Sequence, residues 1–149
     1  MLFADVELRR TDQPERLTML GLKLIPKGRK LAFGQPCSCF DGQWCRIYPD
    51  RPVRCRTFEC RVLKRVQEGE LTTASALKMI EQVRKQARMA RDLMRRLGHT
   101  EERVALSRRF AQIMARPIEL AEDEMVETRA NLMLAVDQLM KCLYRDFLT

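Results

Sequence analysis

Five cysteines lie close together in the first half of the chain and are the residues best suited to chemistry. The 149-residue sequence has six cysteines, and all but Cys142 fall within residues 37–60. They are Cys37, Cys39, Cys45, Cys55 and Cys60. Thiolates are soft ligands, and four of them complete a tetrahedral zinc site or hold an iron–sulfur cubane. In a reducing compartment such a cluster is explained better by metal ligation than by disulfides. We therefore predict zinc or an iron–sulfur cluster as the cofactor.

Backbone geometry restricts which of these thiols can share one metal ion. Cys37 and Cys39 are separated by a single residue, so in an extended chain their side chains point to opposite sides. Cys55 lies near the start of a predicted helix, where free amide groups and the helix dipole favour a thiolate. Cys60 lies five residues further, which on a continuous helix is roughly 140° around the axis. We therefore expect the helix to break near Phe58 if Cys55 and Cys60 bind the same metal.

The side chains around the cysteines suit an anionic metal centre. Four thiolates around Zn²⁺ or a [4Fe–4S]²⁺ core leave a net charge of about −2, which guanidinium groups would stabilise. Five arginines lie in or beside the segment: Arg46, Arg51, Arg54, Arg56 and Arg61. Four aromatic residues are expected to limit solvent access: Phe40, Trp44, Tyr48 and Phe58. We expect Tyr48, Arg51, Arg56 and Phe58 directly around the ligands. The alternative, that the cysteines are small hydrophobic residues of an ordinary core, is disfavoured by their density.

The same residues resemble a known sequence signature. The segment Cys45-Arg-Ile-Tyr48-Pro-Asp-Arg51-Pro52-Val-Arg-Cys55-Arg56-Thr-Phe58-Glu-Cys60 is similar to the pattern C-x-I-Y-x-x-R-P-x-x-C-R-x-F-x-C at every fixed position. This pattern is typical of the zinc- or iron-chelating cysteine-cluster family, the YkgJ-like group with its flagellin N-methylase relatives. Pro36-Cys37 also resembles the upstream P-C element of that family. The resemblance implies that Cys37, Cys45, Cys55 and Cys60 are the metal ligands, with Cys39 as a fifth or substitute thiol.

The chain departs from this family at its amino-terminal end. Members usually open with a C-x2-C-x2-C-C cluster ahead of a segment similar to residues 2–8, whereas this chain begins at Met1. Two alternatives follow: the start codon is assigned too late, or this member has lost half of its ligands. In the first case the full protein holds up to eight thiolates. In the second a single site remains, and a redox or catalytic role loses its support.

Apolar and helix-breaking residues together predict a mainly α-helical protein, with a small irregular cysteine-rich knot packed on three or four helices. Glycine and proline interrupt the cysteine segment too often for a long helix or a central strand. Residues 1–69 are expected to form this metal-binding module, and residues 70–149 a helical hairpin or bundle packed on it as one compact domain. Within the module we expect an extended piece over 2–8, a helix from Asp12, as its cap, to Gly21, a turn over 27–30 and a broken helix over 52–69.

Three helices are expected in the second half, each marked by apolar residues at helical spacing. The first runs from a cap at Thr72 or Thr73 to Gly98, the second from Glu101 to Arg116, and the third over about 120–147. The third carries a stripe close to a heptad seam, formed by Val126, Met133, Val136, Met140, Leu143 and Phe147. Cys142 is expected to pack in or near the core, and His99 to lie on the surface.

Charge is unevenly distributed along the chain. The formal net charge is +8; residues 61–116 carry 14 Lys and Arg against 6 Asp and Glu, and residues 117–149 carry 3 against 7. A basic helix face is formed by Arg84, Arg88, Arg91 and Arg95, which suits nucleic acid or an acidic protein. Pairing of these arginines with the acidic last helix is the favoured interpretation, so a nucleic-acid partner is the weaker prediction. A homodimer through the last helix remains open.

Three classes of function are compatible with this sequence. No apolar run is long enough for a membrane span, and the first residues lack the pattern of a secretion signal, so a cytoplasmic protein of bacterial type is expected. The leading hypothesis is a metal-binding protein of uncertain cellular role. One alternative, implied by the resemblance to flagellin N-methylase relatives, is an iron–sulfur redox or methyl-transfer enzyme. The other is a zinc-stabilised adaptor that binds nucleic acid or an acidic protein through basic helices. No residue is assigned as catalytic.

Overall fold

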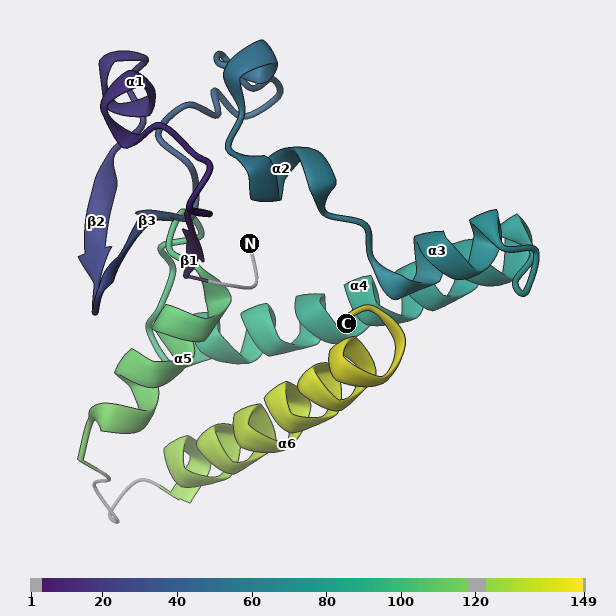
Figure 1. Ribbon diagram of the computed structural model, residues 1–149. Helices are drawn as coiled ribbons and strands as arrows, with labels where there is room; N and C mark the ends of the chain where they lie inside the picture. The colour runs from purple at the N-terminus through teal and green to yellow at the C-terminus, as the bar shows by residue number, and fades with distance from the viewer. Residues whose placement is uncertain (1–3, 118–122, 149) are drawn as a thin grey trace. The chain divides into compact units, whose positions relative to one another are not determined.

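The computed structural model describes residues 4–117 and 123–148, and it is mainly helical, with 56% helix (Figure 1). The elements are β1 (Asp5–Glu7), α1 (Pro14–Met19), β2 (Leu24–Lys27), β3 (Lys30–Gly34), the 3-10 helix η1 (Tyr48–Asp50), α2 (Val53–Thr57), α3 (Arg61–Gln67), α4 (Thr73–Arg96), α5 (Leu106–Ala115) and α6 (Asp123–Asp146). Two compact units result: residues up to 58 with 101–111, and residues 59–100 with those from 112 onward. Residues 59–69, which we expected in the cysteine module, thus belong to the second unit.

The first unit contains a small antiparallel sheet that the sequence analysis did not predict. The strand order is β1-β3-β2, and Phe33 of the central strand pairs with Val6 on one side and Leu24 on the other. The turn expected over 27–30 closes the β2–β3 hairpin, with Gly28 at a φ of +60° that favours glycine. Only the short extended piece near the amino terminus was anticipated. The edge strand β2 is not predictable from the sequence, because it is four residues long and contains Pro26, a residue that disfavours strands but is tolerated at a sheet edge.

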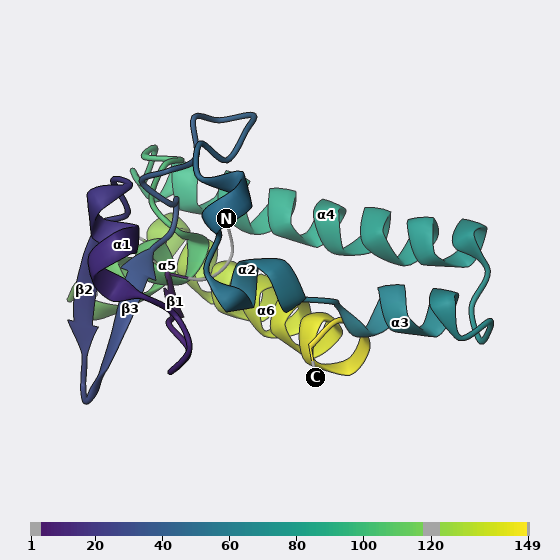
Figure 2. The ribbon, with the colours of Figure 1, turned by 45° about the horizontal axis from the view of Figure 1, so that its top comes forward.

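The core of the first unit is small and includes one of the clustered cysteines. Five buried residues form it: Leu17, Leu22, Phe33, Cys39 and Ile47. Leu17 comes from α1, which lies beside the strands (Figure 2). Because so few side chains are buried together, apolar packing alone provides limited stability for this unit. Much of its order comes from turns and hydrogen bonds, which also position the cysteines.

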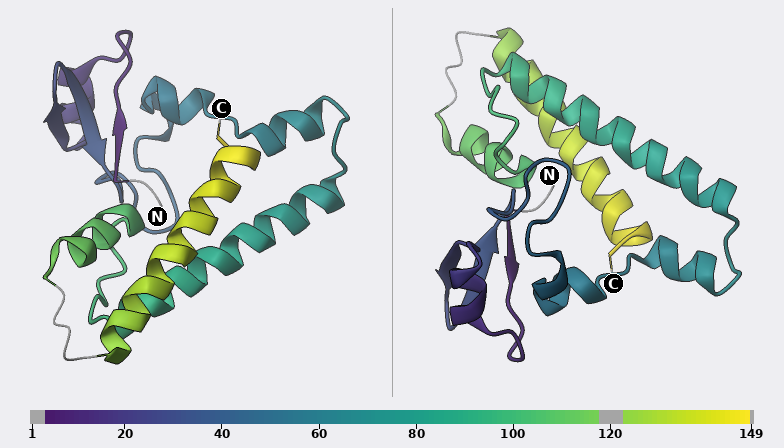
Figure 3. Two further views of the ribbon diagram at one scale, coloured as in Figure 1. Left: turned by 90° about the horizontal axis from the view of Figure 1, so that it is seen from below. Right: turned by 90° about the horizontal axis from the view of Figure 1, so that it is seen from above.

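The second unit is built on two long helices, α4 and α6, which run side by side (Figure 3). The predicted cap of α4 is confirmed, because the amide of Ser75 donates to Thr72 Oγ1 at 3.2 Å. The predicted end is also confirmed. Gly98 has a φ of +79° and follows the last turn, where the amide of His99 reaches the carbonyl oxygen of Met94 at 2.9 Å. His99 itself is half-buried rather than on the surface as expected.

The apolar stripe predicted for the last helix is confirmed at Val136 and Leu143 but wrong at Met133. The buried residues of α6 are Leu132, Ala135, Val136, Leu139, Cys142 and Leu143. Met133, which we placed on the stripe, is 54% exposed. The run from Leu132 to Val136 is apolar at every position, so it contains two alternative stripes, and only packing against α4 selects between them. The prediction that Cys142 packs in the core is confirmed.

The helix α5 is shorter than expected at its amino-terminal end. Residues 101–105 form turns, and the helix begins at Leu106 rather than at Glu101. Arg109 is 2% exposed, so this face of α5 includes a charged residue that the apolar pattern did not reveal. The predicted start of the last helix, near residue 120, lies outside the described residues. Within the described residues, no helix is both long and apolar enough to cross a membrane.

Candidate metal centre

Four of the five clustered cysteines belong to the first unit, and all six cysteines of the chain are free thiols. Cys37 follows β3 after a cis peptide bond between Gln35 and Pro36. The amide of Phe40 donates to the carbonyl oxygen of Cys37 at 3.0 Å and closes a tight turn over residues 37–40. Within this turn the amide of Cys39 lies 3.4 Å from Cys37 Sγ. An N–H group that donates to sulfur stabilises the thiolate form, which is the form that binds metals.

Cys39 occupies a different environment from its neighbour. It is completely buried in the core of the unit, and its thiol faces the carbonyl oxygen of Leu20 at 3.8 Å. Ser38, between the two cysteines, holds the turn against the chain before β2, because its hydroxyl accepts from the amide of Lys23 and donates to the carbonyl oxygen of Gly21. Cys37 is only half-buried and packs against this core from outside.

Cys45 is brought beside this turn by a short hairpin. Phe40 and Cys45 form an isolated antiparallel bridge, and the amide of Arg46 donates to the carbonyl oxygen of Cys39 at 2.9 Å. At the tip, Asp41 Oδ1 accepts from the amides of Gln43 at 2.8 Å and Trp44 at 2.6 Å. These amides lower the pKa of Asp41 below its usual value. The sequence signal for this role is Asp41-Gly42, a turn dipeptide whose aspartate can bond the following amides.

Cys55 is positioned by a contact between two segments that lie far apart in the sequence. It lies in α2, whose first amide, that of Val53, donates to Asp12 Oδ1 at 2.8 Å. The other oxygen of Asp12 accepts from the amide of Arg9 at 2.7 Å. We expected Asp12 to cap α1, and this expectation is wrong: the N-cap of α1 is Gln13, without a side-chain hydrogen bond. Asp12 caps a helix 41 residues further along the chain, a pairing that only the folded chain can create.

The thiols of Cys37, Cys45 and Cys55 lie close enough to influence one another electrostatically. Desolvation raises the pKa of Cys55, the charges of Cys37 and Cys45 raise it further, and Arg51 opposes them. Cys55 is nevertheless an exposed residue. Burial is also the main cause of the raised pKa of Cys37, opposed by the amide of Cys39 and assisted by the charges of Cys39 and Cys45. The thiols of Cys37, Cys45 and Cys55, which come from separate segments of this unit, therefore lie within electrostatic range of one another.

These thiols are not arranged as a finished metal site. In the part of the chain that the structure describes, no three His, Cys, Asp or Glu side chains are placed so that they could hold a metal ion as they stand. A metal held by these thiols would require side-chain rotation or a shift of the loops. The donor set itself, three thiols with an N–H group beside one and a guanidinium near another, fits a soft metal.

The helix break predicted between Cys55 and Cys60 is confirmed. The helix α2 ends at Thr57, Phe58 is extended with φ −73° and ψ 116°, and α3 begins at Arg61 with Cys60 as its N-cap. Cys60 belongs to the second unit and is half-buried there.

Arg61 contacts the end of α6. Its amide donates to the carbonyl oxygen of Phe147 at 3.1 Å, and its guanidinium to that of Arg145 at 2.9 Å. Carbonyl groups at the end of α6 lack helical partners, so they accept these bonds readily.

The residues expected around the ligands have varied environments. The guanidinium of Arg51 stacks 3.5 Å above the ring of Tyr48, and its Nε donates to the Tyr48 carbonyl oxygen at 2.9 Å. Arg56 lines a polar cleft of about 250 Å³ together with Arg16 and Asp50, which form an ion pair at 2.6 Å. The four aromatic residues that we expected to limit solvent access are themselves exposed. Phe40, Trp44, Tyr48 and Phe58 are all exposed, by 43%, 69%, 58% and 67%.

The basic residues of α4 form ion pairs within their own helix. Arg88 binds Glu81 at 2.6 Å, and Arg95 binds Asp92 at 2.7 Å. These pairs are exposed and contribute little to stability. They also show that local neighbours on α4 can supply the negative charge that we had expected from the acidic last helix.

No protein-family model matches this chain, and neither the curated proteins nor the solved structures include a match. The resemblance to the zinc- or iron-chelating cysteine-cluster family therefore stays a prediction from its motif.

Proposed function

We propose that this protein binds a metal, either zinc or an iron–sulfur cluster, through Cys37, Cys45, Cys55 and Cys60. The observation that carries this proposal is the convergence of three thiols from separate segments of the first unit. The Phe40–Cys45 bridge brings the segment with Cys45 beside the turn that contains Cys37, and Cys55 lies in α2, whose first amide donates to Asp12. Such convergence is typical of ligand sets, because a chain has little other reason to bring three thiols near one another outside its core.

Neighbouring groups favour the thiolate form of Cys37 and of Cys55. The amide of Cys39 already lies 3.4 Å from Cys37 Sγ, so deprotonation of Cys37 would strengthen an existing hydrogen bond. Arg51 favours the charged form of Cys55. When bound, the metal would supply the positive charge that offsets the mutual repulsion of the thiolates.

The fourth ligand is assigned from the sequence, and the chain around it permits the assignment. Five residue steps separate Cys60 from Cys55, and a fully extended chain of that length spans up to about 17 Å. Because the helix ends before the extended residue Phe58, Cys55 and Cys60 do not follow the spacing of one continuous helix. Cys39 is the less suitable ligand, because its thiol is completely buried in the apolar core.

A structural role for the metal fits the small core of the first unit. The apolar core cluster of this unit contains five buried side chains, and small units commonly obtain stability from a metal. We therefore propose that the metal stabilises the loops over 36–58.

Metal content of the full chain tests this proposal. The protein would be produced with zinc and iron available, purified without oxygen, and examined by elemental analysis and visible absorption. We expect about one zinc ion or one cluster per chain. Cys45→Ser and Cys55→Ser variants are expected to lose it, whereas the matched Cys142→Ser variant, altered in the buried seam of α6, retains it. Reduced, folded protein with neither metal would overturn the proposal, and so would a Cys55→Ser variant with full metal content.

A further inference from the structure

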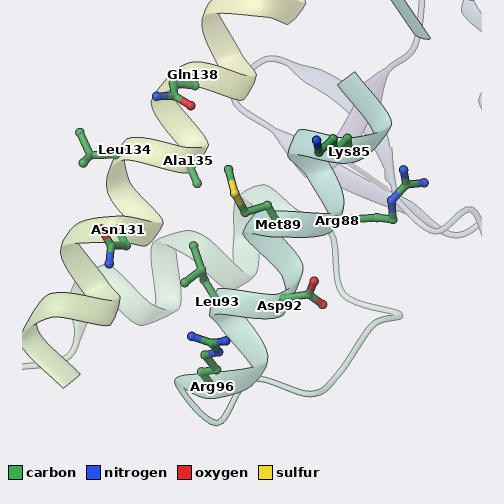
Figure 4. A pocket seen from close by; sticks show the side chains of 10 residues that line it. All are labelled: Lys85, Arg88, Met89, Asp92, Leu93, Arg96, Asn131, Leu134, Ala135 and Gln138. Carbon is green, nitrogen blue, oxygen red and sulfur yellow. The ribbon is translucent and has the colours of Figure 1, made fainter. Parts of the chain in front are cut away.

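A groove of about 670 Å³ lies between α4 and α6 in the second unit (Figure 4). Met89 and Leu93 reach into it from α4, and Leu134 and Ala135 line it from α6. Met89 is 46% exposed and Leu134 is 60% exposed. The apolar floor of the groove is therefore open to solvent in a single copy of the chain, and Leu134 is its most exposed apolar side chain.

The outward face of α6 carries a second heptad stripe through this groove. We call it the outward stripe; its members are Glu127, Asn131, Leu134, Gln138 and Lys141. Their spacing of four, three, four and three residues is the spacing of a coiled-coil seam, and all five are exposed. It is separate from the buried seam, which contacts α4 through residues such as Leu132 and Leu139.

The side chains of the outward stripe are complementary to those of a second copy of the stripe that runs in the opposite direction. Leu134 lies at its centre, an amide side chain lies on each side, and the two ends carry opposite charges, Glu127 and Lys141. In an antiparallel pair centred on Leu134, the leucines meet, Asn131 faces the amide of Gln138, and Glu127 faces Lys141. A parallel pair would place like charges opposite each other at both ends, which is unfavourable.

From this pattern we propose that the groove is the dimerisation site for a second copy of this chain, with the two α6 helices antiparallel about Leu134. Two helical hairpins that join in this way form a four-helix arrangement around a two-fold axis. The pairing covers Leu134 and Met89, the exposed apolar residues of the groove. The Lys85 and Arg96 side chains at the rim can cover apolar surface with their stems while their charges stay in water.

The contacts already made by the end residues permit the pairing. Lys141 binds Asp137 of its own helix at 2.7 Å and is 76% exposed. An ammonium group has three donors, so it can bind a second carboxylate without losing the first. The charge at each end of the pair is then shared between one intrachain and one interchain partner.

Sedimentation velocity of the full chain, under reducing conditions and over a range of concentrations, tests the proposal. We expect a reversible monomer–dimer equilibrium for the unaltered protein. Leu134→Gln is expected to weaken dimerisation by about tenfold or more, because the central apolar contact is lost. The matched variant Met133→Gln removes a similarly exposed side chain one position off the stripe and is expected to have little effect. Circular dichroism confirms that each variant is folded.

Charge exchange tests the orientation. Glu127→Lys alone and Lys141→Glu alone each place like charges together at both ends of the pair, so both are expected to be monomeric. The double variant restores opposite charges and is expected to recover the dimer. A monomer at every concentration up to about 0.5 mM would overturn the proposal. So would a dimer that tolerates Leu134→Gln, or a double variant that dimerises no better than the single ones.

Discussion

Each of the two units of this protein is stabilised by a different set of internal interactions. The second unit has a continuous buried seam along two helices of 24 residues each, with Leu132 and Leu139 completely buried. The first unit buries five residues in its core and otherwise depends on turns, a hairpin bridge and a distant helix cap. Apolar packing therefore contributes more to the second unit than to the first. Four of the five clustered cysteines lie in the first unit.

The largest expected effect is that of metal removal. A chelator added to the reduced metal-bound protein is expected to raise amide exchange over residues 36–58 by about 100-fold or more, because metal binding is coupled to local folding. Amides in the middle of α4 and α6 should keep their protection. Hydrogen exchange measured by mass spectrometry checks both regions in one experiment. Equal loss of protection in both units would remove the distinction between them.

A cavity in the buried seam of the second unit should destabilise that unit and leave the first unit unchanged. Leu139→Ala is expected to lower the free energy of unfolding by about 2–5 kcal/mol, because a completely buried side chain is lost. The matched Leu134→Ala variant alters an exposed position on the same helix and should change the stability of the monomer by no more than about 0.5 kcal/mol. Chemical denaturation followed by circular dichroism measures both. Metal content should be unchanged in either variant, and loss of metal from Leu139→Ala would contradict independent units.

Loss of the distant cap should affect only the first unit. Asp12→Ala removes the acceptor for the first amide of α2 and is expected to cost about 1 kcal/mol, the usual value of a helix cap. Because α2 carries Cys55, weaker metal binding should follow. Asp12→Asn keeps an acceptor oxygen and serves as the control. Competition with a chromophoric chelator measures the affinity, and an Asp12→Ala protein that binds as tightly as the unaltered one would show that α2 needs no such support.

The smallest expected effect is a pH dependence at the tip of the hairpin. The amides of Trp44 and Gln43 hold the pKa of Asp41 below its usual 3.8. The carboxylate of Asp41 therefore contributes fully to the free energy of unfolding at pH values above its pKa in the unfolded chain. This contribution is lost as the pH falls through the lower pKa of the folded state. Trp44 is the single tryptophan of the chain, so its fluorescence reports on this turn. We expect an acid transition with a midpoint below 3.8 that is absent from Asp41→Asn; an unchanged transition in that variant would assign it to another group.

Local patterns predicted well the features that depend on neighbours in the chain. The cap at Thr72, the end of α4 at Gly98, the turn over 27–30 and the break near Phe58 all follow from residues within a few positions of each other. Propensities and turn chemistry act over that range, so one sequence is enough to find them. The unpredicted sheet shows the limit, because a four-residue edge strand with a proline has too little pattern of its own.

By itself, the sequence determined that the protein is mainly helical and that its cysteines gather in one irregular segment. Only the tertiary structure decided that Asp12 caps α2 rather than α1, that Leu132 rather than Met133 is buried, and that four aromatic residues near the cysteines face solvent. The physical reason is common to all three. Several arrangements are equally good locally, and the choice among them depends on packing and hydrogen bonds between residues far apart in the chain.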